Sequence, residues 1–318
     1  MNFYKKAAIN VVNNIERYQD EKILIVAEDS VPMKFPLEIL GNFDDPSASV
    51  MVFKDSGKAN IEPPPQVAKA MKECDILIQC ISNINLYTKA YLDAYNAKTK
   101  ILTMYGLDDY VIENFIAHDD KESKIKTEDV GKSMEDAGNI RIVSGNGTDL
   151  SMKLCKRPVL IDDGYLKHDE IKGDLMPGYV ISVAPLEESI NGILVVDWSI
   201  NPPLNIIETP VKILFMDGKI ESIEGGDESK KFISWINSLE DKKIFFISHL
   251  SIGTNVSIKN FTGKYLLDER KDGAVTIGLG NNLGPYGGKN DSPNHCDLIL
   301  KNASVTADGK VISGKNAK

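Results

Sequence analysis

The first third of the chain alternates short apolar runs with segments of helical periodicity, and this alternation constrains the fold more than any other feature. Strands that are buried on both faces read as continuous apolar runs, so the pattern predicts a parallel sheet flanked by helices, as in a Rossmann-like domain. The apolar runs lie at 22–29, 49–54, 74–80 and 100–106, and the helical periods lie at 1–20, 66–73 and 85–98.

From about residue 140 the pattern changes to short strands separated by turns. Asp217-Gly218 lies between two alternating segments and predicts a β-hairpin. We place the domain boundary in the charged stretch 118–138. The sequence therefore predicts an α/β fold class with two domains. Residues 1–130 form a Rossmann-like domain with a parallel sheet, and residues 131–318 form a larger β-rich α+β domain.

Composition limits the partners of the protein. The net charge of −9 argues against a nucleic-acid surface, since phosphate binding needs clustered Lys and Arg. No apolar run reaches the length of about 18 residues that would predict a membrane span. The four cysteines are scattered without CxxC spacing, which is typical of free thiols in a reducing compartment. We expect a cytoplasmic protein that binds a small molecule, a metal ion or another subunit.

The chain has four histidines, and their positions differ in what they predict. His118 and His168 lie in charged segments, where a solvated surface residue is the favoured interpretation of each. His249 ends the apolar run KKIFFIS, a place where strands commonly deliver site residues. His295 and Asp297 share the i, i+2 spacing that points both side chains to one face of a strand. This HxD pair is either a pair of metal ligands or an ordinary polar turn ahead of a strand.

Six segments in the second half occur in an order that resembles the thermophilic metallo-aminopeptidase family, also called the aminopeptidase T family. This resemblance implies a two-domain homodimer with a metal site in its C-terminal part. The segments are GTDL at 147–150, MPGYVISVAPLEESINGILVVD at 176–197, DGKIESIEGG at 217–226, HLSIGTN at 249–255, LLDERKDGAVTIGLG at 266–280 and GGKNDSPNHCD at 287–297.

The peptidases of that family bind two metal ions through two glutamates, two histidines, a tyrosine and an aspartate. Here the closing HxD is kept, whereas the other four positions hold Tyr179, His249, Thr276 and Leu283, with Tyr286 close to the last of them. Loss of both glutamates removes the carboxylates that a dinuclear hydrolase needs to hold two cations and activate water.

The ligands that remain resemble those of the 2,5-dihydroxypyridine 5,6-dioxygenases, a branch with the aminopeptidase fold and a mononuclear iron site. The resemblance implies His249, His295 and Asp297 as ligands of one metal ion. We expect Fe(II), although Zn, Mn and Co also accept such ligands. The predicted reaction opens a hydroxylated aromatic or heteroaromatic ring with O₂. His118, His168, Tyr179 and Tyr286 are candidates for acid/base chemistry or substrate contact. Two alternatives are a metal-dependent aminopeptidase and a non-catalytic homologue with a residual metal site.

Overall fold

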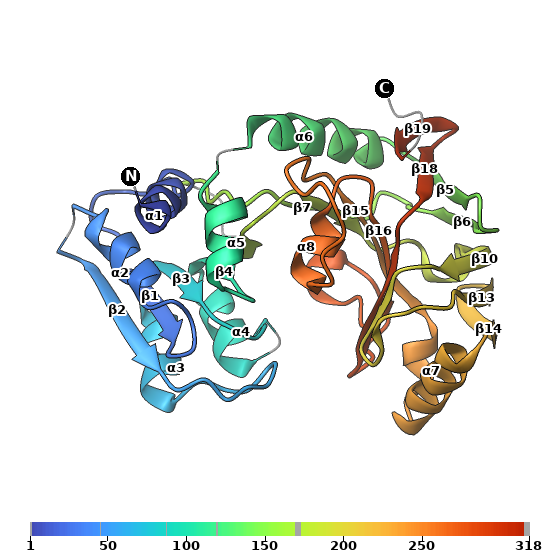
Figure 1. The fold of residues 1–318 in the computed structure, drawn as a ribbon, viewed down its shortest axis with the longest axis horizontal. Helices are drawn as coiled ribbons and strands as arrows, with labels where there is room; N and C mark the ends of the chain where they lie inside the picture. The colour runs from blue at the N-terminus through green and yellow to red at the C-terminus, as the bar shows by residue number, and fades with distance from the viewer. Residues whose placement is uncertain (1, 45, 87, 119, 169–172, 315–318) are drawn as a thin grey trace. The chain divides into compact units, whose positions relative to one another are not determined.

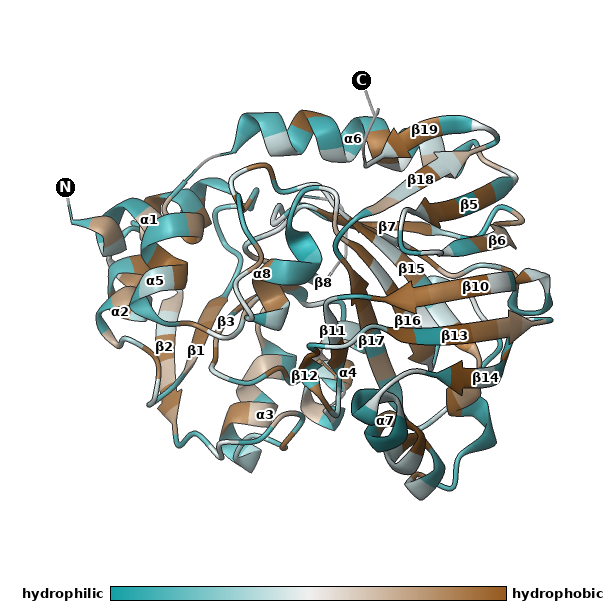
Figure 2. Ribbon diagram, turned by 45° about the vertical axis from the view of Figure 1, so that its right-hand side comes forward, coloured by the Kyte–Doolittle hydropathy of each residue, from teal (hydrophilic) through white to brown (hydrophobic). Residues whose placement is uncertain are grey.

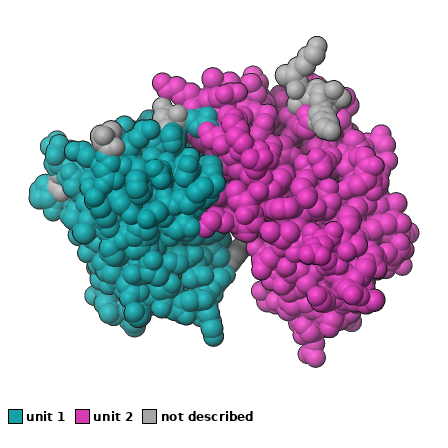
Figure 3. All heavy atoms as spheres, in the orientation of Figure 1, with its two compact units in different colours: residues 1–120, 162–178 teal, residues 121–161, 179–318 magenta. Residues whose placement is uncertain are grey.

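The computed structural model describes residues 2–44, 46–86, 88–118, 120–168 and 173–314. The chain forms two compact units, drawn in different colours in Figure 3. Unit 1 comprises residues 1–120 and 162–178, and unit 2 comprises residues 121–161 and 179–318. The sequence-based division into domains after residue 130 stays a prediction.

Unit 1 is built on a five-stranded parallel sheet with the strand order β2-β1-β3-β4-β8. Its apolar segments form strands where the sequence predicts them, which confirms the parallel sheet and the mixed α/β class. The strands are β1 (Ile23–Glu28), β2 (Ala48–Phe53), β3 (Ile76–Cys80), β4 (Lys100–Met104) and β8 (Gly173–Leu175).

Helices connect and cover these strands (Figure 1). Val67 and Met71 of α3 and Ala90 of α4 pack against Leu24 and Leu77 on one face of the sheet. The helices of unit 1 are α1 (Phe3–Asn13), α2 (Lys34–Gly41), α3 (Pro65–Glu73), α4 (Lys89–Asn96), α5 (Asp109–Val111) and the π-helix η1 (Ile112–Ile116). In the described part of the chain, every helix is too short or too polar to cross a membrane.

Unit 2 contains two seven-stranded sheets that are largely antiparallel. The first has the order β14-β13-β10-β6-β5-β18-β19 and the second the order β12-β11-β17-β16-β15-β9-β7. Strands of the first sheet are β5 (Asn139–Ser144), β6 (Asp149–Lys153), β10 (Asn191–Val196), β13 (Val211–Met216), β14 (Lys219–Glu224), β18 (Ala303–Ala307) and β19 (Lys310–Ser313). Strands of the second are β7 (Val159–Asp162), β9 (Val180–Val183), β11 (Ser199–Asn201), β12 (Asn205–Ile206), β15 (Ile247–Gly253), β16 (Val275–Gly280) and β17 (His295–Leu300).

One apolar core joins the two sheets of unit 2. Leu194 and Phe215 of the first sheet belong to the same buried cluster as Leu250, Ile277 and Leu298 of the second. Figure 2 shows the hydrophobic strands of unit 2 in brown beside the largely hydrophilic helices α6 and α7. The helices of this unit are α6 (Lys121–Glu135), α7 (Asp227–Ser238) and α8 (Tyr265–Arg270), with the 3-10 turns η2 (Glu187–Ser189), η3 (Lys242–Phe245) and η4 (Gly284–Tyr286).

The predicted hairpin is confirmed between β13 and β14. Asp217 and Gly218 have φ angles of 48° and 79°. Positive φ at both central residues is what a two-residue type I′ turn requires, and Asp-Gly is a preferred pair there. The four cysteines are free thiols, and of these Cys155 alone is exposed.

Candidate metal centre

Three neighbouring strands of the second sheet bring His249, His295 and Asp297 together. His295 and Asp297 lie two residues apart on β17 and share one face, as their spacing predicts. Across the sheet, Gly278 of β16 pairs with both His249 of β15 and Asp297. The intervening residue Cys296 points to the opposite face and belongs to the apolar core, as expected from strand alternation.

The three candidate ligand atoms form a small triangle. The Nε2 atoms of His249 and His295 lie 3.3 Å apart, and Oδ1 of Asp297 lies 3.4 Å from the first and 3.2 Å from the second. Ligand atoms at about 2.1 Å from one metal ion lie roughly 3.0–3.4 Å apart in octahedral or tetrahedral geometry. The triangle therefore has the size that three ligands of one ion require.

A β-bulge places His249 on the face of this triangle. Ile247 pairs with Leu279, whereas His249 pairs with Gly278, so Ser248 is an extra residue in β15. In a regular strand Ile247 and His249 would share a face, but the bulge leaves Ile247 in the apolar core and turns His249 to the other side. The expectation that His249 ends a strand is wrong. The preceding residues 242–245 form a 3-10 turn, and His249 lies inside β15.

Gly278 provides the space that the imidazole of His249 occupies. A Cβ atom at Gly278 would lie 2.4 Å from Nε2 of His249, far inside van der Waals contact. A glycine inside a strand often marks a close approach by another group. Here that group is the candidate metal ligand itself.

Electrostatics in the triangle favour a positive charge between the three side chains. Burial would raise the pKa of Asp297, but the charge of His295 and hydrogen bonds with both imidazoles hold it well below its usual range. Burial would lower the pKa of His295, but the charge of Asp297 outweighs burial and raises it. Both shifts have the same cause, because a buried carboxylate stabilises a cation beside it. A divalent metal ion would supply such a charge, so the residues fit a metal.

Further side chains contact two of the three candidate ligands. Oγ of Ser251 lies 3.1 Å from Nδ1 of His249, and Oγ of Ser182 lies 2.7 Å from Oγ of Ser251. The hydroxyl of Tyr265 donates a hydrogen bond of 2.8 Å to Oδ2 of Asp297. Sequence reasoning missed Ser182, Ser251 and Tyr265, because their proximity to the ligands depends on strand register and on the position of α8.

Both tyrosine candidates predicted from the sequence lie in unit 2. The ring of Tyr286 stacks against the imidazole of His249, with centroids 5.2 Å apart and planes 4° apart. Tyr179 precedes β9 with a φ of 77°, and its carbonyl oxygen accepts hydrogen bonds from the amide and hydroxyl of Thr254. The structure thus places the ring of Tyr286 on His249 at the triangle, whereas the carbonyl oxygen of Tyr179 holds Thr254.

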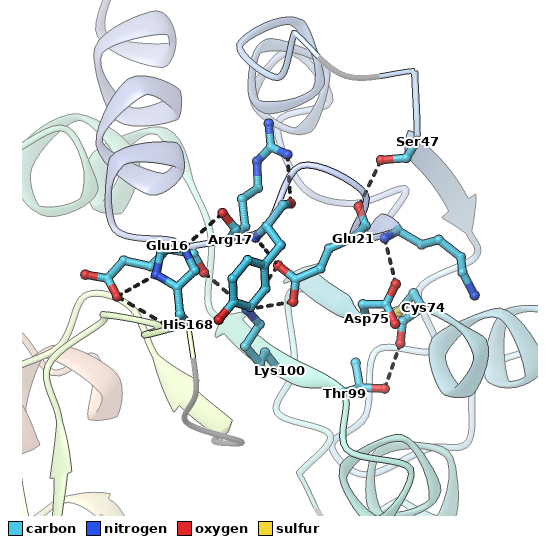
Figure 4. A network of polar contacts seen from close by, with 11 residues as sticks. Glu16, Arg17, Glu21, Ser47, Cys74, Asp75, Thr99, Lys100 and His168 are labelled. Carbon is cyan, nitrogen blue, oxygen red and sulfur yellow. Dashed lines mark hydrogen bonds and ion pairs between the residues drawn. The ribbon is translucent and has the colours of Figure 1, made fainter.

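The two other candidates, His118 and His168, belong to unit 1. His118 is exposed, and its carbonyl oxygen accepts a hydrogen bond from Asn10. The ring of His168 lies 3.1 Å from Oε2 of Glu16 and 3.0 Å from the carbonyl oxygen of Arg17 (Figure 4). These contacts tie His168 to the segment that follows α1. A catalytic role for either histidine stays a prediction.

Two positions that hold metal ligands in the aminopeptidase family lie in different surroundings here. Thr276 is fully buried on β16, and its Oγ1 has no hydrogen-bond partner within the described ranges. Leu283 is 42% exposed in the loop before η4. Neither side chain offers a metal an imidazole, a phenolate or a carboxylate.

The sequence of this chain matches one protein family. Residues 41–316 match the family model for 2,5-dihydroxypyridine 5,6-dioxygenase. A curated enzyme of that name from Pseudomonas putida is 24% identical over 255 residues, which are 77% of this chain and 71% of that protein.

Two solved structures are similar over nearly their whole length. The 2,5-dihydroxypyridine dioxygenase from Pseudomonas putida KT2440 superposes with a TM-score of 0.79 at 17% identity, covering 98% of this chain and 95% of that one. Wild-type AmpT from Thermus thermophilus superposes with a TM-score of 0.68 at 14% identity, covering 97% and 96%. At these identities the superpositions establish a shared fold.

Proposed function

Since this chain belongs to the 2,5-dihydroxypyridine 5,6-dioxygenase family, we propose that it is a mononuclear non-haem Fe(II) dioxygenase that opens the ring of a hydroxylated heteroaromatic. The family resemblance expected from the sequence motifs is thereby confirmed. 2,5-Dihydroxypyridine is the first substrate to test, because the curated relative carries its name.

The triangle of His249, His295 and Asp297 is the observation that carries this proposal. Two imidazoles and one carboxylate on one face of a metal ion are typical of Fe(II) oxygenases, and they leave further coordination positions open. When bound, iron supplies the one-electron chemistry that O₂ requires. The buried side chains of His249 and Asp297, 5% and 9% exposed, hold the ligand atoms in place and limit access of water.

We assign Tyr286 to contact with the substrate ring. Its ring already stacks on His249, so it offers an aromatic surface at the edge of the triangle. The loop that carries Tyr286 is fastened by Glu187, which accepts hydrogen bonds from the side chain of Asn282 and the amide of Lys289. Tyr179, His118 and His168 remain candidates for proton transfer.

The aminopeptidase alternative rests on the fold shared with AmpT. Tyr179 and His249 stand where that family is expected to have glutamates, and Thr276 stands where it is expected to have a histidine. A second metal ion would then lack carboxylate ligands, which favours a mononuclear centre. The homodimer, the cytoplasmic location, the Rossmann-like nature of unit 1 and the choice of iron over Zn, Mn or Co stay predictions.

Metal analysis of anaerobically purified protein tests the proposal. We expect about one iron per chain after reconstitution with competing metals, lost in His249→Ala, His295→Ala and Asp297→Ala. His118→Ala is the matched control for metal content, since it removes an exposed histidine of unit 1.

Activity then separates the two enzymatic classes. Oxygen uptake with 2,5-dihydroxypyridine, lost together with the metal in the three ligand variants, supports the dioxygenase. Two metal ions per chain with release of amino-terminal residues from peptides would instead support the aminopeptidase. Unchanged metal content in His249→Ala would overturn the triad.

A further inference from the structure

A row of buried hydroxyl groups crosses three strands beside the candidate ligands. Ser182 of β9 pairs with Ser251 of β15, and Ser251 pairs with Thr276 of β16. These residues are 5%, 1% and 0% exposed. Ser251 follows His249 by two residues on the same face of β15. The row of hydroxyl groups is therefore the neighbour of the row of paired residues that contains His249.

The two ring nitrogens of His249 have different neighbours. Nε2 faces His295 and Asp297 in the triangle, whereas Nδ1 faces the hydroxyl of Ser251. A neutral imidazole carries a proton on one nitrogen and a lone pair on the other. A neutral His249 ring can therefore bind a metal through Nε2 only when its proton is on Nδ1, and an acceptor beside Nδ1 favours that tautomer.

The hydroxyl of Ser182 gives Ser251 a hydrogen-bond partner other than His249. A serine hydroxyl has one hydrogen to donate and two lone pairs that accept. If Ser251 donates its hydrogen to Oγ of Ser182, 2.7 Å away, its own oxygen is free to accept the Nδ1 proton of His249. If the Ser251 hydroxyl instead donated its hydrogen to Nδ1, this bond would favour the tautomer with a proton on Nε2.

We propose that Ser251, with Ser182 behind it, is a positioning residue that holds His249 as the tautomer protonated on Nδ1 and so presents Nε2 to the metal. This inference rests on the proposed metal site. His295 provides a contrast, because its Nδ1 is buried and has no hydrogen-bond partner among the residues that the structure describes. The hydroxyl pair therefore acts on one of the two imidazoles.

Zinc affinity of the full-length protein is the first measurement, made by competition with a chromophoric chelator. Loss of a partner that orients a ligand histidine typically weakens metal binding about 10–100-fold. We expect Ser251→Ala to bind zinc that much more weakly and Ser251→Thr, which keeps the hydroxyl, to stay within about threefold of wild type. Thr276→Val is the matched control. It removes a buried hydroxyl of the same row that makes no hydrogen bond to any described residue, His249 included, and we expect unchanged affinity.

A second readout follows the Nδ1 proton directly. In zinc-loaded protein with ¹⁵N-labelled histidine, we expect the Nδ1–H resonance of His249 to be protected from exchange with water. Ser251→Ala should lose this protection, whereas Ser251→Thr and Thr276→Val should keep it. Ser182→Ala removes the outer hydroxyl alone. It should weaken zinc binding less than Ser251→Ala, and it serves as the test variant if Ser251→Ala does not fold.

The outcomes distinguish this inference from the proposed function. If wild type binds zinc, His249→Ala does not, and Ser251→Ala keeps both affinity and proton protection, the positioning role is overturned and the metal site stands. If His249→Ala binds zinc as tightly as wild type, the metal triad fails and the role of Ser251 fails with it.

Discussion

Replacing Gly278 with alanine tests the geometry of the metal centre without touching a ligand. The new Cβ would lie 2.4 Å from Nε2, 2.6 Å from Cδ2 and 2.9 Å from Cε1 of His249. Ordinary contacts between such atoms lie at about 3.5 Å or more, so the imidazole would have to move by roughly 1 Å. A shift of this size separates Nε2 from the other two ligand atoms, and we expect Gly278→Ala to lose the metal.

The fold should survive this substitution. Overpacking in a closely packed site costs roughly 1–3 kcal/mol. Alanine recovers about 0.5–1 kcal/mol over glycine inside a strand. The free energy of unfolding should therefore fall by about 0–2.5 kcal/mol. The protein should stay folded while it loses the metal.

Metal content by mass spectrometry, together with thermal unfolding of the metal-free protein, measures both effects. Gly145→Ala is the control, because a Cβ at Gly145 meets no heavy atom within 4 Å. It should keep the metal and the unfolding temperature of wild type. Retention of metal at wild-type affinity in Gly278→Ala would refute the placement of His249.

Three further substitutions test the loop that carries Tyr286, the hydrogen bond to Asp297 and the core of unit 2. Burial raises the pKa of Glu187, but hydrogen bonds from Arg157 and Lys289 outweigh it and lower this pKa to about 2. The stabilisation is thus complete above the ordinary value of 4.5 and lost as the pH falls through about 2. Glu187→Gln should cost about 1–2 kcal/mol at pH 7, after a discount for solvent screening, and the difference in unfolding temperature from wild type should vanish below about pH 2. Tyr265→Phe removes the hydrogen bond to Asp297 and should weaken metal binding about 10-fold in the chelator competition, with an unchanged unfolding temperature of the metal-free protein. Phe215→Ala, deep in the core of unit 2, should lower the free energy of unfolding by about 3–5 kcal/mol in urea titrations. A loss below 1 kcal/mol would contradict the packing described for that core.

The parallel sheet could be predicted from sequence because burial on both faces leaves a continuous apolar signal. β1 and β3 are buried at every position, and both lie within predicted runs. The charged stretch 118–138 gave no such signal, yet most of it forms the helix α6. Its buried positions have helical spacing, but two of them are polar: Ser123, Thr127, Val130, Gly131 and Met134. Hydroxyl side chains that are buried in a helix therefore concealed its inner face.

The candidate site was predictable where the relevant spacing is local. His295 and Asp297 lie on one strand, so the i, i+2 rule alone places them on one face. The relation of His249 to them depends on pairing across β16, which single-sequence periodicity does not contain. Ser251 and Tyr265 were missed for the same reason, since each reaches a ligand only after the strands and α8 have taken their places.

Two departures from a regular sheet act together on His249. The extra residue Ser248 in β15 turns the imidazole to the face of Asp297, and the missing side chain at Gly278 in β16 leaves room for it there. Neither feature alone would place the imidazole of His249 beside Asp297. A regular strand would turn His249 into the core, and a side chain at Gly278 would displace its ring. The affinity for metal is therefore coupled to the register of β15 and β16. A substitution that shifts this register would be measured as loss of metal even when all three ligands are unchanged.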